Sequence, residues 1–260
     1  MTRIISIANQ KGGVGKTTTA INMATALAAI KKRVLLIDLD PQGNATTGIG
    51  IYNRNNATSY DLLIHRKNLS EAITRTTIPS LSIVCSSLDL VGAEVELING
   101  TDRSDILKNI LRPYNGMFDY VIIDSPPSMG ILTLNSLSAA DGVIIPLQCE
   151  YYALEGLTYL MHTMQRIKAS INRRIQIYGI VLTMYDKRNS LSIQVEKDVR
   201  KHFGTTVFKT VIPRNIKISE APSHGKPVIL YDVKCIGALA YMKLVKEFIE
   251  KEISGVWTKN

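Results

Sequence analysis

A glycine-rich segment near the amino end carries the residues with the clearest chemistry. Residues 9–19 read NQKGGVGKTTT, between an apolar run at 4–8 and a stretch at 17–30 that contains neither Gly nor Pro. This context predicts strand, loop and helix, and such a loop directs backbone N–H groups and the positive end of the helix at a polyphosphate. Lys16 would reach the β- and γ-phosphates, and the Thr17 hydroxyl would bind the magnesium ion that bridges them.

A second lysine lies in the same loop, although a plain phosphate-binding loop needs only one. Lys11 directly precedes two adjacent glycines, which compresses the pattern to KGGVGKT. The alternative is a glycine-rich turn with an incidental lysine, which the strand, the spacing, the Lys-Thr pair and the helix together disfavour. We therefore expect nucleotide contacts from Lys11, Gly12, Gly13, Val14, Gly15, Lys16, Thr17 and Thr18.

Two other apolar runs end in carboxylates. The run at 33–38 leads into Asp38-Leu-Asp40-Pro-Gln-Gly-Asn, and the run at 119–123 leads into Asp124. Ligands of parallel sheets bind where the strands end, and an aspartate at such a strand end is typical of a magnesium site. An acidic residue can also end a strand simply as a turn former or helix cap. Next to the glycine-rich loop, both segments favour a triphosphate site.

Strand and helix patterns alternate along the chain. We expect strands at 4–8, 33–38, 81–85, 119–123, 142–147, 175–183 and 207–212, and helices at 17–30, 103–112, 154–170, 190–203 and 235–253. Alternation of this kind predicts an α/β fold, a doubly wound and mostly parallel sheet flanked by helices. The glycine-rich loop between the first strand and helix adds the P-loop NTPase type to this expectation. No linker or repeat divides residues 1–260, so a single domain is expected.

The composition limits the other classes. Cys85, Cys149 and Cys235 lie far apart without a CxxC pair, which predicts reduced thiols, and the four histidines lack metal-ligand spacing. No apolar run approaches the roughly 18 to 20 residues of a membrane span, and the first strand begins too early for a signal peptide. We expect a cytoplasmic protein whose only metal is the magnesium of its nucleotide.

Positive charge is concentrated in the last hundred residues. Residues 1–160 contain 13 Lys and Arg against 14 Asp and Glu, whereas residues 161–260 contain 18 against 8. The phosphate-binding loop lies in the neutral part, so the basic part favours a second polyanion such as DNA, RNA or an anionic membrane. A solvated basic surface without a partner is the alternative.

Taken together, these segments resemble the deviant Walker-type ATPases. Within that group the chain is similar to the ParA/Soj partition ATPases along nearly its whole length. The motifs that carry the likeness are KGGVGKT, Asp38-Leu-Asp40-Pro-Gln, Asp124-Ser-Pro-Pro, Thr183-Met-Tyr-Asp186, Ile212-Pro-Arg-Asn215 and Ser219-Glu-Ala-Pro-Ser-His-Gly-Lys-Pro227.

The resemblance implies hydrolysis of ATP, with magnesium, in an ATP-dependent homodimer that sandwiches its nucleotides. Lys11 would reach the phosphates held by the other subunit, and Asp40 would position or activate the attacking water. With Lys16 these two residues form the expected catalytic set. The implied magnesium shell is Thr17, with Asp40 and Asp124 acting through water.

The same resemblance implies an adenine wall and two partners. The adenine side would be formed by Pro213, Arg214 and Asn215. The partners would be double-stranded DNA, bound without sequence preference, and a ParB-like centromere-binding protein that stimulates hydrolysis. A nucleoid-associated protein is the implied location.

Candidate DNA contacts come mainly from one helix and the loop before it. In helix 190–203 we expect Leu191, Val195, Val199 and Phe203 to be buried, because they recur at four-residue steps. Non-specific binding uses phosphate contacts and weakens with salt. The candidates are Arg188 in the loop, Lys197, Arg200 and Lys201 on outward faces of the helix, and Lys226, Lys243 and Lys246 further on.

Three other classes of protein fit this sequence less well. A MinD-like membrane-associated division ATPase needs a basic amphipathic C-terminal helix, but the tail from Phe248 to Trp257 is acidic there and is interrupted by Gly255. An iron–sulfur carrier needs bridging cysteines after Asp124, where the sequence Ser-Pro-Pro-Ser-Met-Gly has none. A non-enzymatic interaction protein would lack the catalytic groups that this chain contains. No membrane partner is expected.

Overall fold

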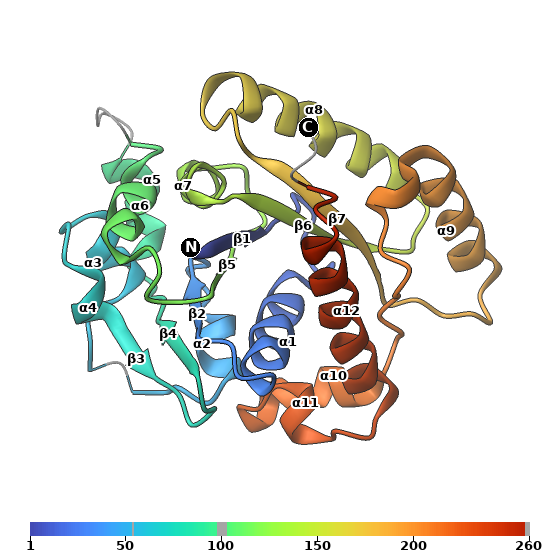
Figure 1. Ribbon diagram of the computed structural model, residues 1–260, viewed down its shortest axis with the longest axis horizontal. Helices are drawn as coiled ribbons and strands as arrows, with labels where there is room; N and C mark the ends of the chain where they lie inside the picture. Colours follow the sequence, from blue (N-terminus) through green and yellow to red (C-terminus); the bar gives the residue numbers. More distant parts are fainter. Residues whose placement is uncertain (54, 98–102, 258–260) are drawn as a thin grey trace.

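The structure, a computed structural model, describes residues 1–53, 55–97 and 103–257. Its centre is a seven-stranded sheet with helices on both faces (Figure 1). The strands are β1 (Arg3–Ile7), β2 (Val34–Asp38), β3 (Ile73–Arg75), β4 (Leu81–Val84), β5 (Tyr120–Asp124), β6 (Gly142–Gln148) and β7 (Gln176–Thr183). They lie in the order β3-β4-β2-β5-β1-β6-β7, and only the edge strand β3 pairs antiparallel. The expected mostly parallel, doubly wound sheet is confirmed.

Two helical layers cover this sheet because alternate strand residues point to opposite faces. Leu36 and Ile122 pack with one layer, whereas Leu35 and Ile37 pack with the other. The first layer comprises α1 (Lys16–Ala29), α2 (Asn44–Gly48), α10 (Ile216–Glu220), α11 (Val228–Tyr231) and α12 (Ile236–Ile253). The second comprises α3 (Ser59–Leu63), α4 (Leu69–Ala72), α5 (Leu90–Glu96), α6 (Ile106–Leu111), α7 (Ile131–Ala139), α8 (Ala153–Ser170) and α9 (Ser190–Phe203).

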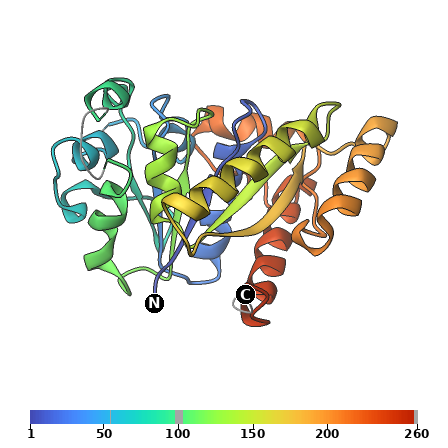
Figure 2. The same cartoon turned by 90° about the horizontal axis from the view of Figure 1, so that it is seen from above.

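The strand order brings three separate loops to one edge of the sheet. β1 lies between β5 and β6, and β2 lies on the other side of β5, all parallel. The loops that follow β1, β2 and β5 therefore meet where these strands end. The start of β1 and the end of α12 lie at the opposite edge, at the bottom of Figure 2.

The predicted strand at 207–212 is wrong. Only two isolated bridges form beside β7, from Val207 to Ile180 and from Pro213 to Tyr185. Between them, the N–H groups of Lys209 and Thr210 donate to the carboxylate of Glu247 on α12, at 2.7 and 2.9 Å. Because a side chain takes these donors, the hydrogen bonding to β7 is interrupted between Phe208 and Ile212, whose N–H groups donate to the carbonyls of Ile180 and Leu182.

The sequence patterns missed the short helices. Helices α2 to α5, α7, α10 and α11 have four to nine residues, too few for the 3.6-residue period to repeat clearly. Helix α7 also lacks a solvent-exposed polar face, since residues 132–139 are buried except Leu134. The long helices were found within a few residues of their ends, although Leu191 of α9, expected to be buried, is 38% exposed.

The C-terminal helix packs its aromatic residues onto the sheet. Phe248 of α12 is fully buried, and the Trp257 ring lies 4.4 Å from that of Tyr178 and 5.1 Å from that of Phe248. These rings are thus part of the fold. Within the described ranges, no helix is both long enough and apolar enough to cross a bilayer.

Candidate nucleotide-binding site

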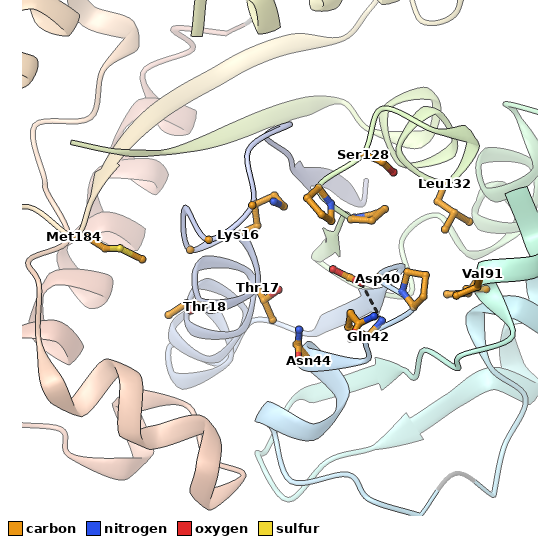
Figure 3. A pocket seen from close by; sticks show the side chains of 17 residues that line it. Lys16, Thr17, Thr18, Asp40, Gln42, Asn44, Val91, Ser128, Leu132 and Met184 are labelled. Carbon is orange, nitrogen blue, oxygen red and sulfur yellow. Dashed lines mark hydrogen bonds between the residues drawn. The ribbon is translucent and has the colours of Figure 1, made fainter. Parts of the chain in front are cut away.

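A cleft of about 620 Å³ opens where the three loops meet (Figure 3). Its walls come from the loop after β1, the segment after β2, helix α5, the segment after β5 and Met184 after β7. The lining residues are Gly12, Gly13, Gly15, Lys16, Thr17, Thr18, Asp40, Pro41, Gln42, Asn44, Leu90, Val91, Pro126, Pro127, Ser128, Leu132 and Met184. The structure therefore brings together residues that lie far apart in the sequence.

Backbone conformation explains two of the loop glycines. Gly13 and Gly15 have φ angles of 74° and 87°, a left-handed region that side-chain-bearing residues avoid. Gly15 also forms the N-cap of α1, so the free amides of that helix face the cleft. The Thr183 hydroxyl donates to the carbonyl of Val14 at 2.8 Å and ties the loop to the end of β7. The loop is thus shaped as an anion cradle.

Lys16 lies within this cradle. Its ammonium donates to the carbonyl oxygen of Lys11 at 2.9 Å, and the residue is only 7% exposed. Burial lowers the pKa of Lys16, while the carboxylates of Asp124 and Asp40 oppose that shift. A cation with little solvent around it interacts strongly with an incoming phosphate.

Lys11 is held differently, with its backbone fixed and its side chain half exposed. Its N–H donates to the Asn9 side-chain oxygen at 3.1 Å, and Asn9 in turn donates to the carbonyl of Pro146 at 2.7 Å. The Lys11 ammonium forms an ion pair with Glu150, which follows β6. Its side chain is 48% exposed. Of the two loop lysines, it is therefore Lys11 that faces outward.

Asp124 provides a place for a divalent cation. The residue is fully buried, and neither carboxylate oxygen has a hydrogen-bond partner within the described part of the chain. Burial raises the pKa of Asp124 well above its usual range, and Asp38 adds to the rise, while the nearby Thr17 hydroxyl opposes it. A buried carboxylate without partners requires a counter-ion, and carboxylate with hydroxyl oxygens suits Mg²⁺. Asp124 and Thr17 thus fit the expected magnesium shell.

Asp40 keeps part of its carboxylate for the cleft. Its Oδ1 accepts the N–H of Gln42 at 3.0 Å, the contact dashed in Figure 3, and its backbone carbonyl accepts the N–H of Gly43 at 2.9 Å. These bonds form a turn that directs the side chain to the cleft wall. Within the described ranges, no hydrogen bond to the other oxygen, Oδ2, is found.

The expected adenine wall is not part of the cleft lining. The turn at Pro213, Arg214 and Asn215 bonds to Tyr185, whose carbonyl accepts the Arg214 N–H at 3.0 Å. The neighbouring Met184, which has a left-handed φ of 50°, lines the cleft instead. The turn therefore lies beside Tyr185, next to Met184 in the chain, and a contact with adenine stays a prediction.

The candidate DNA contacts occupy three different environments. Arg188 has an 85% exposed side chain, but its guanidinium forms an ion pair with Asp186 at 2.9 Å. Lys197 and Lys201 are exposed on α9, as Lys243 and Lys246 are on the outer face of α12. A separate group surrounds Lys226, which lines a 250 Å³ cavity that shares Thr17, Thr18 and Asn44 with the cleft.

Arg200 is less exposed than expected, with a 30% exposed side chain, and a DNA contact from it stays a prediction. Its guanidinium donates to Glu196 at 2.8 Å and to the carbonyls of Phe208 and Lys209 at 3.0 and 3.3 Å. These contacts join α9 to the segment 207–212, where they satisfy the carbonyls of Phe208 and Lys209. Arg200 therefore stabilises this junction.

Sequence reasoning missed several residues of the site. Pro126, Pro127 and Ser128 lie in the recognised Asp124 segment and were given no role, and Leu90 and Val91 belong to an unpredicted helix. Glu150, the partner of Lys11, had no motif around it. The available signal was a charged residue three positions beyond the end of a predicted strand.

The fold and the site define a P-loop ATPase. A glycine-rich loop between β1 and α1, with Lys16 and Thr17 in the cleft and the buried Asp124 beside them, is the arrangement that binds a nucleoside triphosphate with magnesium. A family model described as an AAA domain, AAA_31, matches residues 2–177.

Comparison with known proteins gives the family. The chain is 55% identical to "Chromosome partitioning protein ParA" of Caulobacter vibrioides, over 96% of this chain and 95% of that protein. It is 50% identical to "Sporulation initiation inhibitor protein Soj" of Bacillus subtilis, over 95% and 98%. The chain belongs to the ParA/Soj family of partition ATPases and hydrolyses ATP with Mg²⁺.

A solved structure agrees with this fold and cofactor. The Mycobacterium smegmatis protein named cobyrinic acid a,c-diamide synthase, with a bound ATP analogue and magnesium, superposes with a TM-score of 0.86 at 36% identity. The match covers 98% of this chain and 97% of that one.

Proposed function

We propose that this chain is an ATP-dependent switch for DNA partition. ATP closes two subunits face to face, the closed dimer binds double-stranded DNA without sequence preference, and hydrolysis releases it. A ParB-like centromere-binding partner stimulates that hydrolysis, and the protein acts on the nucleoid in the cytoplasm. The observation that carries the proposal is the outward, half-exposed Lys11 beside a cleft that already has its own buried lysine, Lys16.

In this proposal Lys11 completes the site of the other subunit. Phosphoryl transfer depends mainly on positioning and on stabilising charge, so a cation supplied by a partner both accelerates hydrolysis and depends on assembly. Lys16 binds phosphate within its own subunit, and Asp40 orients the attacking water. Magnesium, when bound with the nucleotide, offsets phosphate charge, and Thr17 and Asp124 would hold it. The buried Asp124 carboxylate beside the Thr17 hydroxyl supports this role.

The DNA contacts in this proposal are made by exposed cations. Lys197, Lys201 and Lys243 are exposed and form no ion pair within the described part of the chain. Arg188 joins them once its bond to Asp186 is exchanged for phosphate. Lys226 and Lys246 are further members of the set. Contacts to phosphate release counter-ions and read no bases, so binding should weaken steeply with salt.

The names of the relatives favour DNA partition over the activity of the synthase and over that of MinD. The proteins at 50 to 55% identity bear partition or sporulation names, whereas the synthase is 36% identical. A MinD of Pyrococcus horikoshii is 25% identical. The membrane-associated reading is the alternative, and the packing of Phe248 and Trp257 into the fold counts against a membrane-binding tail.

Co-sedimentation tests the proposal and its alternative together. The protein is incubated with duplex DNA or with anionic liposomes, each with ATP, with ADP or without nucleotide. We expect sedimentation with DNA in ATP only, and its loss in Lys11→Ala while ADP affinity is kept. Lys108→Ala, on α6 and outside the cleft, is the matched control. Liposome binding in ATP would favour the membrane-associated alternative. If Lys11→Ala bound DNA as well as the wild-type protein does, Lys11 would not act at the site of the other subunit.

A further inference from the structure

The carboxylate of Asp38 connects both ends of the segment that contains Asp40. Asp38 ends β2 and is fully buried. Its Oδ1 accepts the N–H of Asp40 at 3.2 Å, and its Oδ2 accepts the N–H and the hydroxyl of Thr46 at 2.8 and 2.7 Å. One side chain thereby fixes the start of the turn at Asp40 and the first turn of α2.

Two serines from other elements complete this connection. The Ser86 N–H, just after β4, donates to the Thr46 hydroxyl at 3.0 Å, and the Ser86 hydroxyl donates to the carbonyl of Asp40. The Ser59 hydroxyl of α3 donates to the Asp38 carbonyl at 2.8 Å. Asp38, Thr46 and Ser86, which we call the Asp38 network, are all buried. Buried hydrogen bonds with every member satisfied hold their groups in one geometry.

The network surrounds the backbone of Asp40 and leaves its side chain in the cleft. The N–H of Asp40 is bound by Asp38 and its carbonyl is bound by Ser86 and by the Gly43 N–H. None of the three network residues lines the cleft, whereas Asp40, Gln42 and Asn44 do. The network therefore acts on the nucleotide only through the segment that it holds.

We propose that Asp38, Thr46 and Ser86 are positioning residues for hydrolysis, which set the direction of the Asp40 carboxylate. The inference rests on the proposed function, since it takes Asp40 as the residue that orients the attacking water. A displacement of about 1 Å in such a group can lower a rate by about 100-fold without affecting binding. The network thus governs the chemical step and not the affinity for nucleotide.

A network that served only stability would behave differently. Its loss would lower the melting temperature and would leave kcat unchanged at temperatures well below melting, because the folded fraction would have an intact site. A positioning network lowers kcat in the folded protein, with the affinity for ADP retained. The readouts are therefore kcat, the ADP dissociation constant and the melting temperature, all measured for the full chain.

Thr46→Val tests this inference, because it removes the hydroxyl that bonds Asp38 and Ser86 but keeps the side-chain shape. We expect kcat to fall by about 10- to 100-fold, with ADP affinity within about twofold, and Thr46→Ser to restore most of the rate. Ser86→Ala, which breaks only the bond to the Asp40 carbonyl, should lower kcat less. Thr25→Val is the matched control, since its buried hydroxyl bonds only the Ile21 carbonyl within α1.

The double variant with Thr46→Val and Asp40→Ala tests whether the network acts on kcat through Asp40. If the network acts through Asp40, Thr46→Val causes no further loss of kcat in the Asp40→Ala background, a non-additivity expected of residues that act as a unit. Wild-type kcat in folded Thr46→Val and Ser86→Ala, with hydrolysis by Asp40→Ala reduced to a residual rate, would overturn the positioning role. Normal hydrolysis by Asp40→Ala itself would instead overturn the catalytic role of Asp40 in the proposed function.

Discussion

Lys11 and Glu150 form an ion pair within one chain, from the glycine-rich loop after β1 to the segment after β6. The lysine proposed to act across the dimer is thus already bound by a carboxylate of its own subunit. Reaching another subunit requires this pair to separate. Both side chains are partly exposed, so the pair is worth about 0.2 to 1 kcal/mol, as is typical of solvent-exposed ion pairs.

Glu150→Gln should therefore favour the ATP-bound dimer. Removal of the competing carboxylate frees Lys11 in both subunits, and two pairs at up to about 1 kcal/mol each correspond to a dimer association constant up to about 30-fold higher. Sedimentation velocity with a non-hydrolysable ATP analogue measures the effect. Glu155→Gln, an exposed carboxylate in the first turn of α8, is the control. A weaker dimer in Glu150→Gln would mean that Glu150 instead holds Lys11 in its active position.

Asp124→Asn should stabilise the nucleotide-free, magnesium-free protein and abolish hydrolysis. Burial raises the pKa of Asp124, so the folded state retains a proton that the unfolded chain releases above about pH 4, and stability falls as pH rises. The amide removes this penalty, and we expect a higher melting temperature at pH 7.5 in EDTA.

Asp38 provides an internal comparison for that measurement. Burial also raises its pKa, to about 6, so part of the pH dependence between about pH 4 and 6 remains in Asp124→Asn. Asp119→Asn should act oppositely, because Arg33 holds the pKa of Asp119 below its usual range and its charge favours folding. A melting temperature of Asp124→Asn below that of wild type in EDTA would contradict the argument.

Lys197→Glu should weaken retention of duplex DNA in ATP. The residue is exposed and forms no ion pair within the described ranges, so its substitution removes a phosphate contact and adds repulsion. The slope of log K against log salt should decrease by about 0.9 for one lost contact. Fluorescence anisotropy at several salt concentrations measures both quantities. ADP affinity serves as the control, and an unchanged salt slope would exclude Lys197 from the DNA surface.

Arg200→Ala should destabilise the fold instead. Its guanidinium bonds Glu196 and two backbone carbonyls, and groups left unpaired in this way cost about 1 to 3 kcal/mol. That loss lowers the melting temperature of a chain of this size by roughly 3 to 10 °C. Lys197→Ala on the same helix should change it little. Loss of DNA retention in Arg200→Ala without a change in melting temperature would mean that Arg200 contacts DNA and does not stabilise the fold.

The elements that the sequence predicted well are those with local signals. Strands such as β2 and β5 are continuous apolar runs, and α8 and α12 repeat their apolar residues over 18 positions each. The glycines and Lys16 likewise belong to one short segment, whose chemistry follows from residue types and spacing. For these parts, neighbours in the sequence supply most of the determining interactions.

Tertiary contacts decided the rest. Residues 207–212 have the apolar character of a strand, but the carboxylate of Glu247, far along the chain, binds two of their amides. Arg200 has the spacing of a surface residue, but it bonds carbonyls of that same irregular segment. The contacts of Lys11 with Glu150, and of Ser86 with Thr46 and Asp40, depend on which strands are neighbours in the sheet. Residue types and local spacing thus specify what each segment can bind, whereas strand order and long-range hydrogen bonds select which partner it has.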